Sequence, residues 1–138
     1  NGGGNMDKMN VYKEEMLNKK VWVVVGATPN EEKFGYKIWE ILKKHNYETY
    51  GVNPKYDEIK GNKVYSSLKD IPVKPDVIDF VVPPKVTTTF FEEAKELGIE
   101  YLWFQPGTFD EDVIKKAEEM GFKILYHDCV LATLKGRE

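Results

Sequence analysis

Short apolar runs alternate along the chain with longer segments in which apolar residues recur at helical spacing. The run Val21–Val25 is rich in β-branched side chains and ends at Gly26, which is typical of a strand buried on both faces. Four more strands are predicted, at residues 48–52, 77–82, 99–104 and 123–126. Apolar stripes that predict helices lie between them, at Ile38, Ile41, Leu42 and His45, at Val86, Phe90, Phe91, Ala94 and Leu97, and at Val113, Ile114, Ala117 and Met120.

Two segments outside this alternation carry weaker patterns. Residues 7–18 predict a leading helix with Asp7 as its N-cap. Residues 56–75 are charged and rich in turn-forming residues, and there Leu68 and Ile71 predict one short helix packed on the sheet edge.

Strand and helix alternate about every 25 residues, and no two-residue hairpin signal separates adjacent strands. Such alternation favours parallel strands joined by right-handed crossovers. The sequence therefore predicts a single-domain α/β fold, in which a doubly wound, five-stranded, mostly parallel sheet lies between two layers of helices.

The loops at the carboxyl ends of these strands are expected to meet at one ligand crevice. They begin at Gly26, Asn53, Pro83, Gln105 and His127. The helix after Gly26 presents its amino terminus at the same place, where free N–H groups and the positive end of the helix dipole favour an anion. A phosphate-bearing ligand is therefore predicted.

The glycine spacing excludes two common nucleotide sites. The dinucleotide fingerprint G-x-G-x-x-G is missing, because eight residues without glycine separate Gly26 from Gly35, and the P-loop pattern G-x-x-x-x-G-K-S/T does not occur. The second strand ends in Gly51-Val52-Asn53, without the acidic residue that holds the ribose of NAD. Lys55 instead suits a phosphate on the ribose. Both NADP and coenzyme A (CoA) carry one, so the residues leave these two cofactors open.

Composition and charge limit the number of domains, the partners and the cellular compartment that are expected for the protein. Its 138 residues fit one domain, and 20 Lys plus Arg against 23 Asp plus Glu give a net charge of −3, which does not favour nucleic acid as a partner. The single cysteine, Cys129, excludes an internal disulfide and agrees with a reducing compartment. Because no apolar stretch reaches about 18 residues and no secretory signal is visible, we expect a cytoplasmic protein without a membrane partner. Residues 1–5, with three consecutive glycines, are expected to be a tag remnant ahead of a domain at residues 6–138.

Six short stretches near the predicted loops resemble one family. In chain order they are Val24-Val25-Gly26-Ala27-Thr28, Gly51-Val52-Asn53-Pro54-Lys55, Val64-Tyr65-Ser66-Ser67-Leu68 with Ile71-Pro72, Val82-Pro83-Pro84, Leu102-Trp103-Phe104-Gln105-Pro106-Gly107 and Asp128-Cys129. In this order they are similar to the stand-alone CoA-binding domain proteins and to the amino-terminal domain of the succinyl-CoA synthetase α subunit. The resemblance implies a Rossmann-like fold that binds CoA or an acyl-CoA at the carboxyl edge of the sheet.

The resemblance also implies roles for individual loops. Residues 26–28 would hold the diphosphate, and residues 82–84 would flank the adenine. Residues 53–55 would lie near the ribose phosphate, where Lys33 competes with Lys55 for the contact. The full set of expected cofactor-binding residues is Gly26, Ala27, Thr28, Lys33, Asn53, Pro54, Lys55, Val82, Pro83, Pro84, Gln105, Gly107 and Cys129.

Catalysis by this chain alone is not expected. The sequence offers no convincing pair of general acid and base, and two histidines and one cysteine lie scattered without metal-ligand spacing, so no catalytic or metal residue is assigned. Cys129 is followed by Val130, where the family commonly has proline, and is expected to be packed or to lie near the pantetheine thiol rather than to act as a nucleophile. The larger synthetase relatives carry a phosphorylated histidine in a second domain, so acyl-CoA ligation by this chain alone is not expected.

Two other functions stay open. An NADP-dependent oxidoreductase would use the same sheet and Lys55, and a non-catalytic subunit of an acyl-CoA ligase-type complex would serve as a scaffold for a catalytic partner. A homodimer is a further alternative, for which exposed Tyr101 or Trp103 would supply the contact face.

Overall fold

The computed structural model describes residues 2–138, and side chains from Met6 onward. The elements follow one another as α1 (Gly2–Leu17), β1 (Val21–Val25), α2 (Phe34–Lys44), β2 (Glu48–Val52), β3 (Glu58–Ile59), β4 (Asn62–Tyr65), the 3-10 turn η1 (Leu68–Asp70), β5 (Val77–Phe80), α3 (Pro84–Thr87), the 3-10 turn η2 (Thr88–Phe90), α4 (Phe91–Glu96), β6 (Tyr101–Phe104), α5 (Glu111–Glu119), β7 (Lys123–Leu125) and α6 (Val130–Lys135). Each of the five predicted strands is present, within one or two residues of its expected bounds.

The sheet has the strand order β3-β4-β2-β1-β5-β6-β7, with β1 at its centre. All neighbouring strands run parallel except β3 and β4. From β1 the chain builds outward through β2 to β4 and then returns to place β5 on the other side of β1, so the strand order reverses between β1 and β5. The predicted doubly wound, mostly parallel sheet is confirmed, although it has seven strands rather than five.

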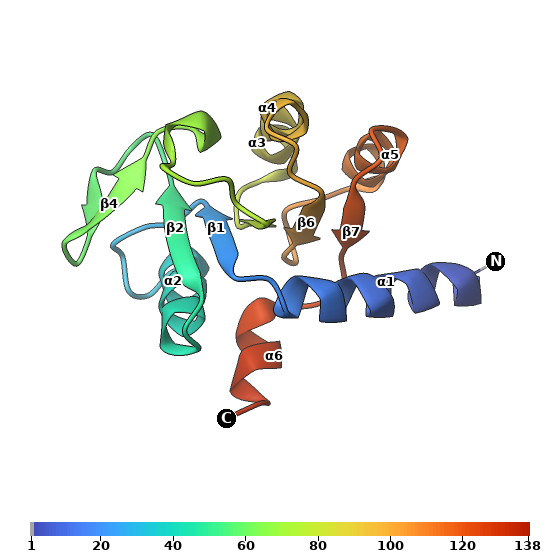
Figure 1. Ribbon diagram of the computed structural model, residues 1–138, viewed down its shortest axis with the longest axis horizontal. Coiled ribbons are helices and arrows are strands. Elements are labelled where there is room, and N and C mark those ends of the chain that lie inside the picture. The colour runs from blue at the N-terminus through green and yellow to red at the C-terminus, as the bar shows by residue number, and fades with distance from the viewer. Residues whose placement is uncertain (1) are drawn as a thin grey trace.

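Helices cover both faces of this sheet (Figure 1), with α3, α4 and α5 on one face and α1, α2 and α6 on the other. Successive residues of β1 supply both layers. Trp22 and Val24 pack in the cluster that contains residues of α1, α2 and α6, whereas Val23 and Val25 pack in the cluster that contains residues of α4 and α5. Burial on both faces explains why β1 is a continuous apolar run in the sequence.

The segment between β2 and β5 differs most from the prediction. Where one short helix was expected, the chain forms a hairpin of β3 and β4, and only the turn η1 is helical. The hairpin loop is Lys60–Gly61, with φ of 48° and 82°, so a two-residue hairpin is present although the sequence carries no signal for one. The loop lacks the usual Asn-Gly or Asp-Gly signal because a lysine occupies its first left-handed position.

Smaller differences concern helix boundaries. Helix α1 begins at Gly2, so Asp7 lies inside it and is not its N-cap. The helix predicted over residues 86–97 is divided into α3 and α4 by the turn η2, and α6 was not predicted. The expectation that residues 1–5 are a tag remnant stays a prediction, and Asn1 lies outside the described residues.

Two aromatic residues proposed for a dimer face are buried instead. Trp103 is 0% exposed and donates a hydrogen bond from Nε1 to the carbonyl of Asp128 at 3.0 Å, and Tyr101 is 7% exposed. Both therefore belong to the core and offer no contact face. Within residues 2–138, no helix combines the length and the apolar character needed to cross a membrane.

Candidate functional site

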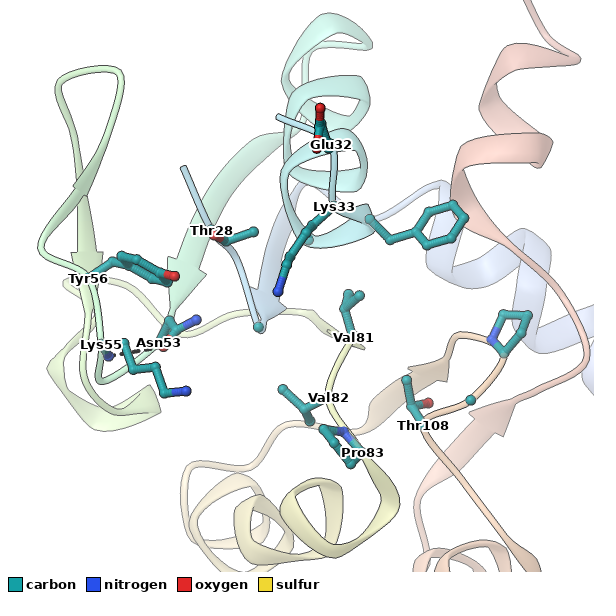
Figure 2. Close-up of a pocket in the computed structure, with 15 residues that line it drawn as sticks. Thr28, Glu32, Lys33, Asn53, Lys55, Tyr56, Val81, Val82, Pro83 and Thr108 are labelled. Atoms are coloured by element: carbon teal, nitrogen blue, oxygen red, sulfur yellow. Dashed lines mark hydrogen bonds between the residues drawn. The ribbon is translucent and has the colours of Figure 1, made fainter. Parts of the chain in front are cut away.

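A cavity of about 610 Å³ opens at the carboxyl edge of the sheet, at the point where the strand order reverses. Its walls come from the loop after β1 with the first turn of α2, and from the loops after β2, β5 and β6 (Figure 2). The volume lies within the range of about 300–1,000 Å³ that is usual for small-molecule sites. This is the crevice in which open α/β sheets bind ligands.

Gly26 lets the loop after β1 pass close to the loop after β5. Its φ is 105°, its N–H donates to the carbonyl of Val52 at 2.9 Å, and a Cβ at this position would lie 2.8 Å from the carbonyl oxygen of Val81. An L side chain is therefore disfavoured both by the backbone conformation and by the space. Gly26 brings the end of β1 and the end of β5 together on one side of the cavity.

Gly35 brings α2 against the same loop. A Cβ on Gly35 would lie 2.1 Å from the carbonyl oxygen of Gly26, so only glycine permits the observed approach. Among the described residues no side chain caps α2, because its N-cap Lys33 has an extended backbone and makes no capping hydrogen bond. The backbone of Phe34 and Gly35 and the positive end of the α2 dipole therefore lie at a cavity that an anion can enter.

Asn53 ties the loop after β2 to the loop after β1. Its Nδ2 donates to the carbonyl of Ala27 at 3.0 Å, and its Oδ1 accepts from the backbone N–H of Lys55 at 3.0 Å. The backbone N–H of Asn53 donates to the carbonyl of Tyr65 at 2.9 Å. These three bonds fix the direction in which the chain continues through Lys55 to Tyr56, both of which line the cavity.

The charge of the cavity lining is positive. Lys33 and Lys55 contribute two ammonium groups, and Glu32 contributes one carboxylate. In Figure 2, Lys33 extends across the middle of the cavity, while Lys55 lies beside Asn53 at one end. Both lysines are exposed, so each can turn toward a ligand without loss of buried contacts.

The structure brings most of the predicted cofactor-binding residues to this cavity. Those that line it are Gly26, Thr28, Lys33, Asn53, Lys55, Val82, Pro83 and Gly107. Lining residues that the sequence reasoning missed are Glu32, Phe34, Gly35, Tyr56, Val81, Pro106 and Thr108. Each of these lies within two positions of a predicted residue, so extending the predicted loops by one or two positions would have found them.

Five predicted residues do not line the cavity. Ala27 is fully buried, and its Cβ lies where a Cβ on Gly51 would approach to 2.8 Å. Pro54 occupies the turn held by Asn53, and Pro84 is the first residue of α3. Cys129 is the N-cap of α6, is half-buried and is not one of the lining residues.

Gln105, the fifth of these residues, is a structural tie rather than a lining residue. Its side chain is buried, Nε2 donates to Oδ1 of Asp79 at 2.7 Å, and Oε1 accepts from the backbone N–H of Val130 at 3.3 Å. The amide thereby joins β5 to the start of α6. Its place at a strand end suggested a ligand contact, but that place does not determine the direction of the side chain.

Asp79 is the fully buried partner of Gln105. Burial raises the pKa of its carboxyl well above the usual range, and the hydrogen bond from Gln105 opposes this shift only in part. Oδ2 has no hydrogen-bond partner among the described residues. Burial therefore favours the neutral form of this carboxyl inside the sheet.

The remaining candidates for chemistry are dispersed. Within residues 2–138, no group of three or more His, Cys, Asp or Glu side chains is arranged to hold a metal ion. His127 is exposed, with a φ of 69°, and its ring packs edge-on against Tyr126 at 4.7 Å between centroids. It lies outside the cavity lining.

Comparison with known proteins shows which proteins share this arrangement. A family described as "CoA binding domain" matches residues 20–135. The chain is 32% identical over 132 residues to the ADP-forming acetate–CoA ligase I of Archaeoglobus fulgidus, covering 85% of this chain and 18% of that enzyme. It is 31% identical over 128 residues to the α subunit of ADP-forming acetate–CoA ligase I of Pyrococcus furiosus, covering 81% of this chain and 28% of that subunit.

A solved structure extends the likeness to three dimensions. A conserved hypothetical protein of Pyrococcus furiosus superposes with a TM-score of 0.78 at 39% identity, covering 83% of this chain and 99% of the other. The chain thus spans less than a third of the two ligase relatives but nearly all of this small protein. These matches do not support NADP as the ligand or an oxidoreductase activity.

The buried carboxyl of Asp79 predicts a dependence of stability on pH. Because its pKa is raised in the folded state, the folded protein keeps a proton that the unfolded chain releases above its own pKa of about 3.9. The free energy of unfolding should therefore fall as pH rises from about 4 toward the folded-state pKa, by up to about 1.4 kcal/mol per pH unit. Asp79→Asn should lack this component, since the amide stays neutral and still accepts from Gln105.

Urea unfolding of both proteins across pH 4 to 9 measures the effect. The difference in unfolding free energy should move in favour of Asp79→Asn as pH rises, and parallel profiles would contradict the assignment. Asp57→Asn, at an exposed position, is the control for the loss of one carboxyl group.

Proposed function

The chain belongs to the CoA-binding domain family, and on that premise we propose that it binds CoA or an acyl-CoA in the cavity at the carboxyl edge of the sheet. The observation that carries the proposal is the close junction of Gly26 with Gly35, which opens the amino end of α2 into the cavity. Backbone N–H groups at such a junction bind phosphate oxygens without any dedicated side chain. The best-supported function is therefore ligand binding.

The diphosphate has its proposed place at the loop 26–28 and the first turn of α2. Thr28 lines the cavity there, and its Oγ1 accepts from the backbone N–H of Asn30 at 3.2 Å, which holds the loop in a turn. Without side chains on Gly26 and Gly35, a ligand can approach the backbone closely. The dipole of α2 and the ammonium of Lys33 both favour the charge of a diphosphate.

The ribose phosphate has its proposed place near Lys55. This lysine follows the turn that Asn53 holds, so its backbone position is fixed while its side chain is exposed. Lys33 is the alternative, because it also lines the cavity and lies between the two ends (Figure 2). A free ammonium near either place would recognise the phosphate that distinguishes CoA from its dephosphorylated form.

The adenine has its proposed place against Val82 and Pro83. Both line the cavity, and Val82 is half-buried. The backbone N–H groups of Val86 and Thr87 donate to the carbonyl of Pro83 at 2.9 and 3.0 Å, which anchors this loop on α3. An apolar wall on a fixed backbone suits the face of a flat ring.

We propose that this chain alone binds its ligand without catalysis, because its candidate groups for chemistry are dispersed. A second candidate follows from one relative, the α subunit of ADP-forming acetate–CoA ligase I of Pyrococcus furiosus, of which this chain spans 28%. We propose as the second candidate that the chain is a non-catalytic, CoA-presenting part of a ligase-type complex.

A melting experiment tests the leading proposal. CoA at about 100 times its Kd should raise the free energy of unfolding by about 2.7 kcal/mol. In a chain of this size that corresponds to an increase in Tm of about 10 °C. NADP at the same concentration is the control, because it shares the adenine, the diphosphate and a phosphate on the ribose with CoA but lacks the pantetheine arm. An increase with NADP and none with CoA would overturn the proposal.

Alanine variants can separate the roles proposed for Lys33 and Lys55. Lys55→Ala should weaken CoA binding about tenfold and leave the affinity for 3′-dephospho-CoA unchanged, because only CoA has the ribose phosphate. Lys33→Ala should weaken both ligands, since its place is beside the diphosphate. Calorimetric titration measures these affinities, with Lys69→Ala, an exposed lysine outside the cavity lining, as control. The reverse pattern would assign the ribose phosphate to Lys33.

The second candidate predicts an association. The tagged protein, isolated from its native host under mild conditions, should retain a larger partner whose mass fits the missing part of a ligase, and mass spectrometry would identify that partner. Recovery of the chain alone at its own mass of 16.0 kDa would favour simple CoA binding over the complex.

A further inference from the structure

Phe34 has the most exposed large hydrophobic side chain among the described residues, at 60%. It is the first residue of α2, whose other apolar side chains, such as Ile38 and Leu42, are buried in the core. Its ring has Lys37 Nζ 5.9 Å from the centroid. The fold gains little from this ring, and because single exposed hydrophobic residues are common on protein surfaces, its significance depends on where it lies.

The ring lies at one particular part of the cavity wall. Phe34 lines the cavity together with Pro106 and Gly107, which belong to the loop after β6. In Figure 2 that loop, marked by Thr108, lies on the opposite side of Val81 and Val82 from Tyr56, Asn53 and Lys55. The cavity thus has a polar end beside β2 and an apolar end where a phenylalanine and a proline lie exposed.

The CoA molecule is likewise divided into a charged part and an apolar part. Its nucleotide carries the phosphates, while its pantetheine arm is uncharged and begins with a branched apolar segment next to the diphosphate. If the diphosphate lies at the first turn of α2 and the nucleotide extends toward Lys55, the arm leaves the diphosphate on the other side. The first residue of α2 is then adjacent to the start of the arm.

We infer that Phe34 packs on the pantetheine arm and determines the preference of the site for CoA over the bare nucleotide. The inference rests on the proposed function and adds to it a residue that selects for the arm. Covering an exposed aromatic ring with the apolar segment of the arm removes apolar surface of both partners from water. Pro106 completes the contact from the loop after β6.

Calorimetric titration of CoA and of adenosine 3′,5′-bisphosphate, which lacks the arm, tests the inference. Phe34→Ala should weaken CoA about tenfold and leave the affinity for the bisphosphate unchanged, and Phe34→Leu should retain part of the CoA affinity. Val73→Ala is the control, because Val73 is 41% exposed and lies before β5, at the opposite edge of the sheet. Melting curves verify that each variant is folded.

The other outcomes are distinct. An equal loss for both ligands would show that Phe34 acts on the nucleotide or on the shape of the α2 terminus, and would overturn the inference. Unchanged affinity for both ligands would overturn it as well, and would leave CoA binding itself intact. If the unaltered protein bound neither ligand, the proposed function would fail first and the inference with it.

Discussion

The closeness of α2 to the end of β1 is the constraint on which the site depends. A Cβ on Gly35 would lie 2.1 Å from the Gly26 carbonyl oxygen, and a Cβ on Gly51 would lie 2.8 Å from the Cβ of Ala27. Glycines at three separated positions therefore permit what the glycine-rich fingerprint permits in dinucleotide sites. These effects are a tight turn, an open approach to the backbone and close packing of helix on strand. The fingerprint is missing from the sequence, but its physical functions are present in the fold.

The sequence was informative where one local pattern determines the outcome. The buried strands follow from apolar runs such as Val21–Val25. The sequence was uninformative where a contact between residues distant in the chain determines the local backbone conformation. Lys60 takes a left-handed φ because the hairpin packs Ile59 and Val64 into the core, and nothing local to the lysine indicates it.

The same distinction between local patterns and long-range contacts explains which residues of the site could be predicted from the sequence. Loops that end parallel strands must meet, so Gly26, Asn53 and Pro83 could be placed at one cavity from their position alone. The direction of a side chain is not determined by position, and Gln105 accordingly turns inward to Asp79. Phe34 was missed because the helical stripe begins at Ile38, and an exposed aromatic outside a stripe has no periodic signal.

Hydrogen bonds within the protein hold the walls of the cavity in place without a ligand. Asn53 binds the carbonyl of Ala27, Thr87 Oγ1 donates to the carbonyl of Thr108 at 2.8 Å, and Gln105 joins Asp79 to α6. A ligand that enters such a site spends little of its binding free energy on ordering loops. The exposed side chains Lys33, Lys55 and Phe34 are the part that is free to adapt. In the proposed mode of binding, the fixed backbone and Lys33 supply the affinity for the diphosphate, while Lys55 and Phe34 discriminate between ligands, and all three side chains are exposed.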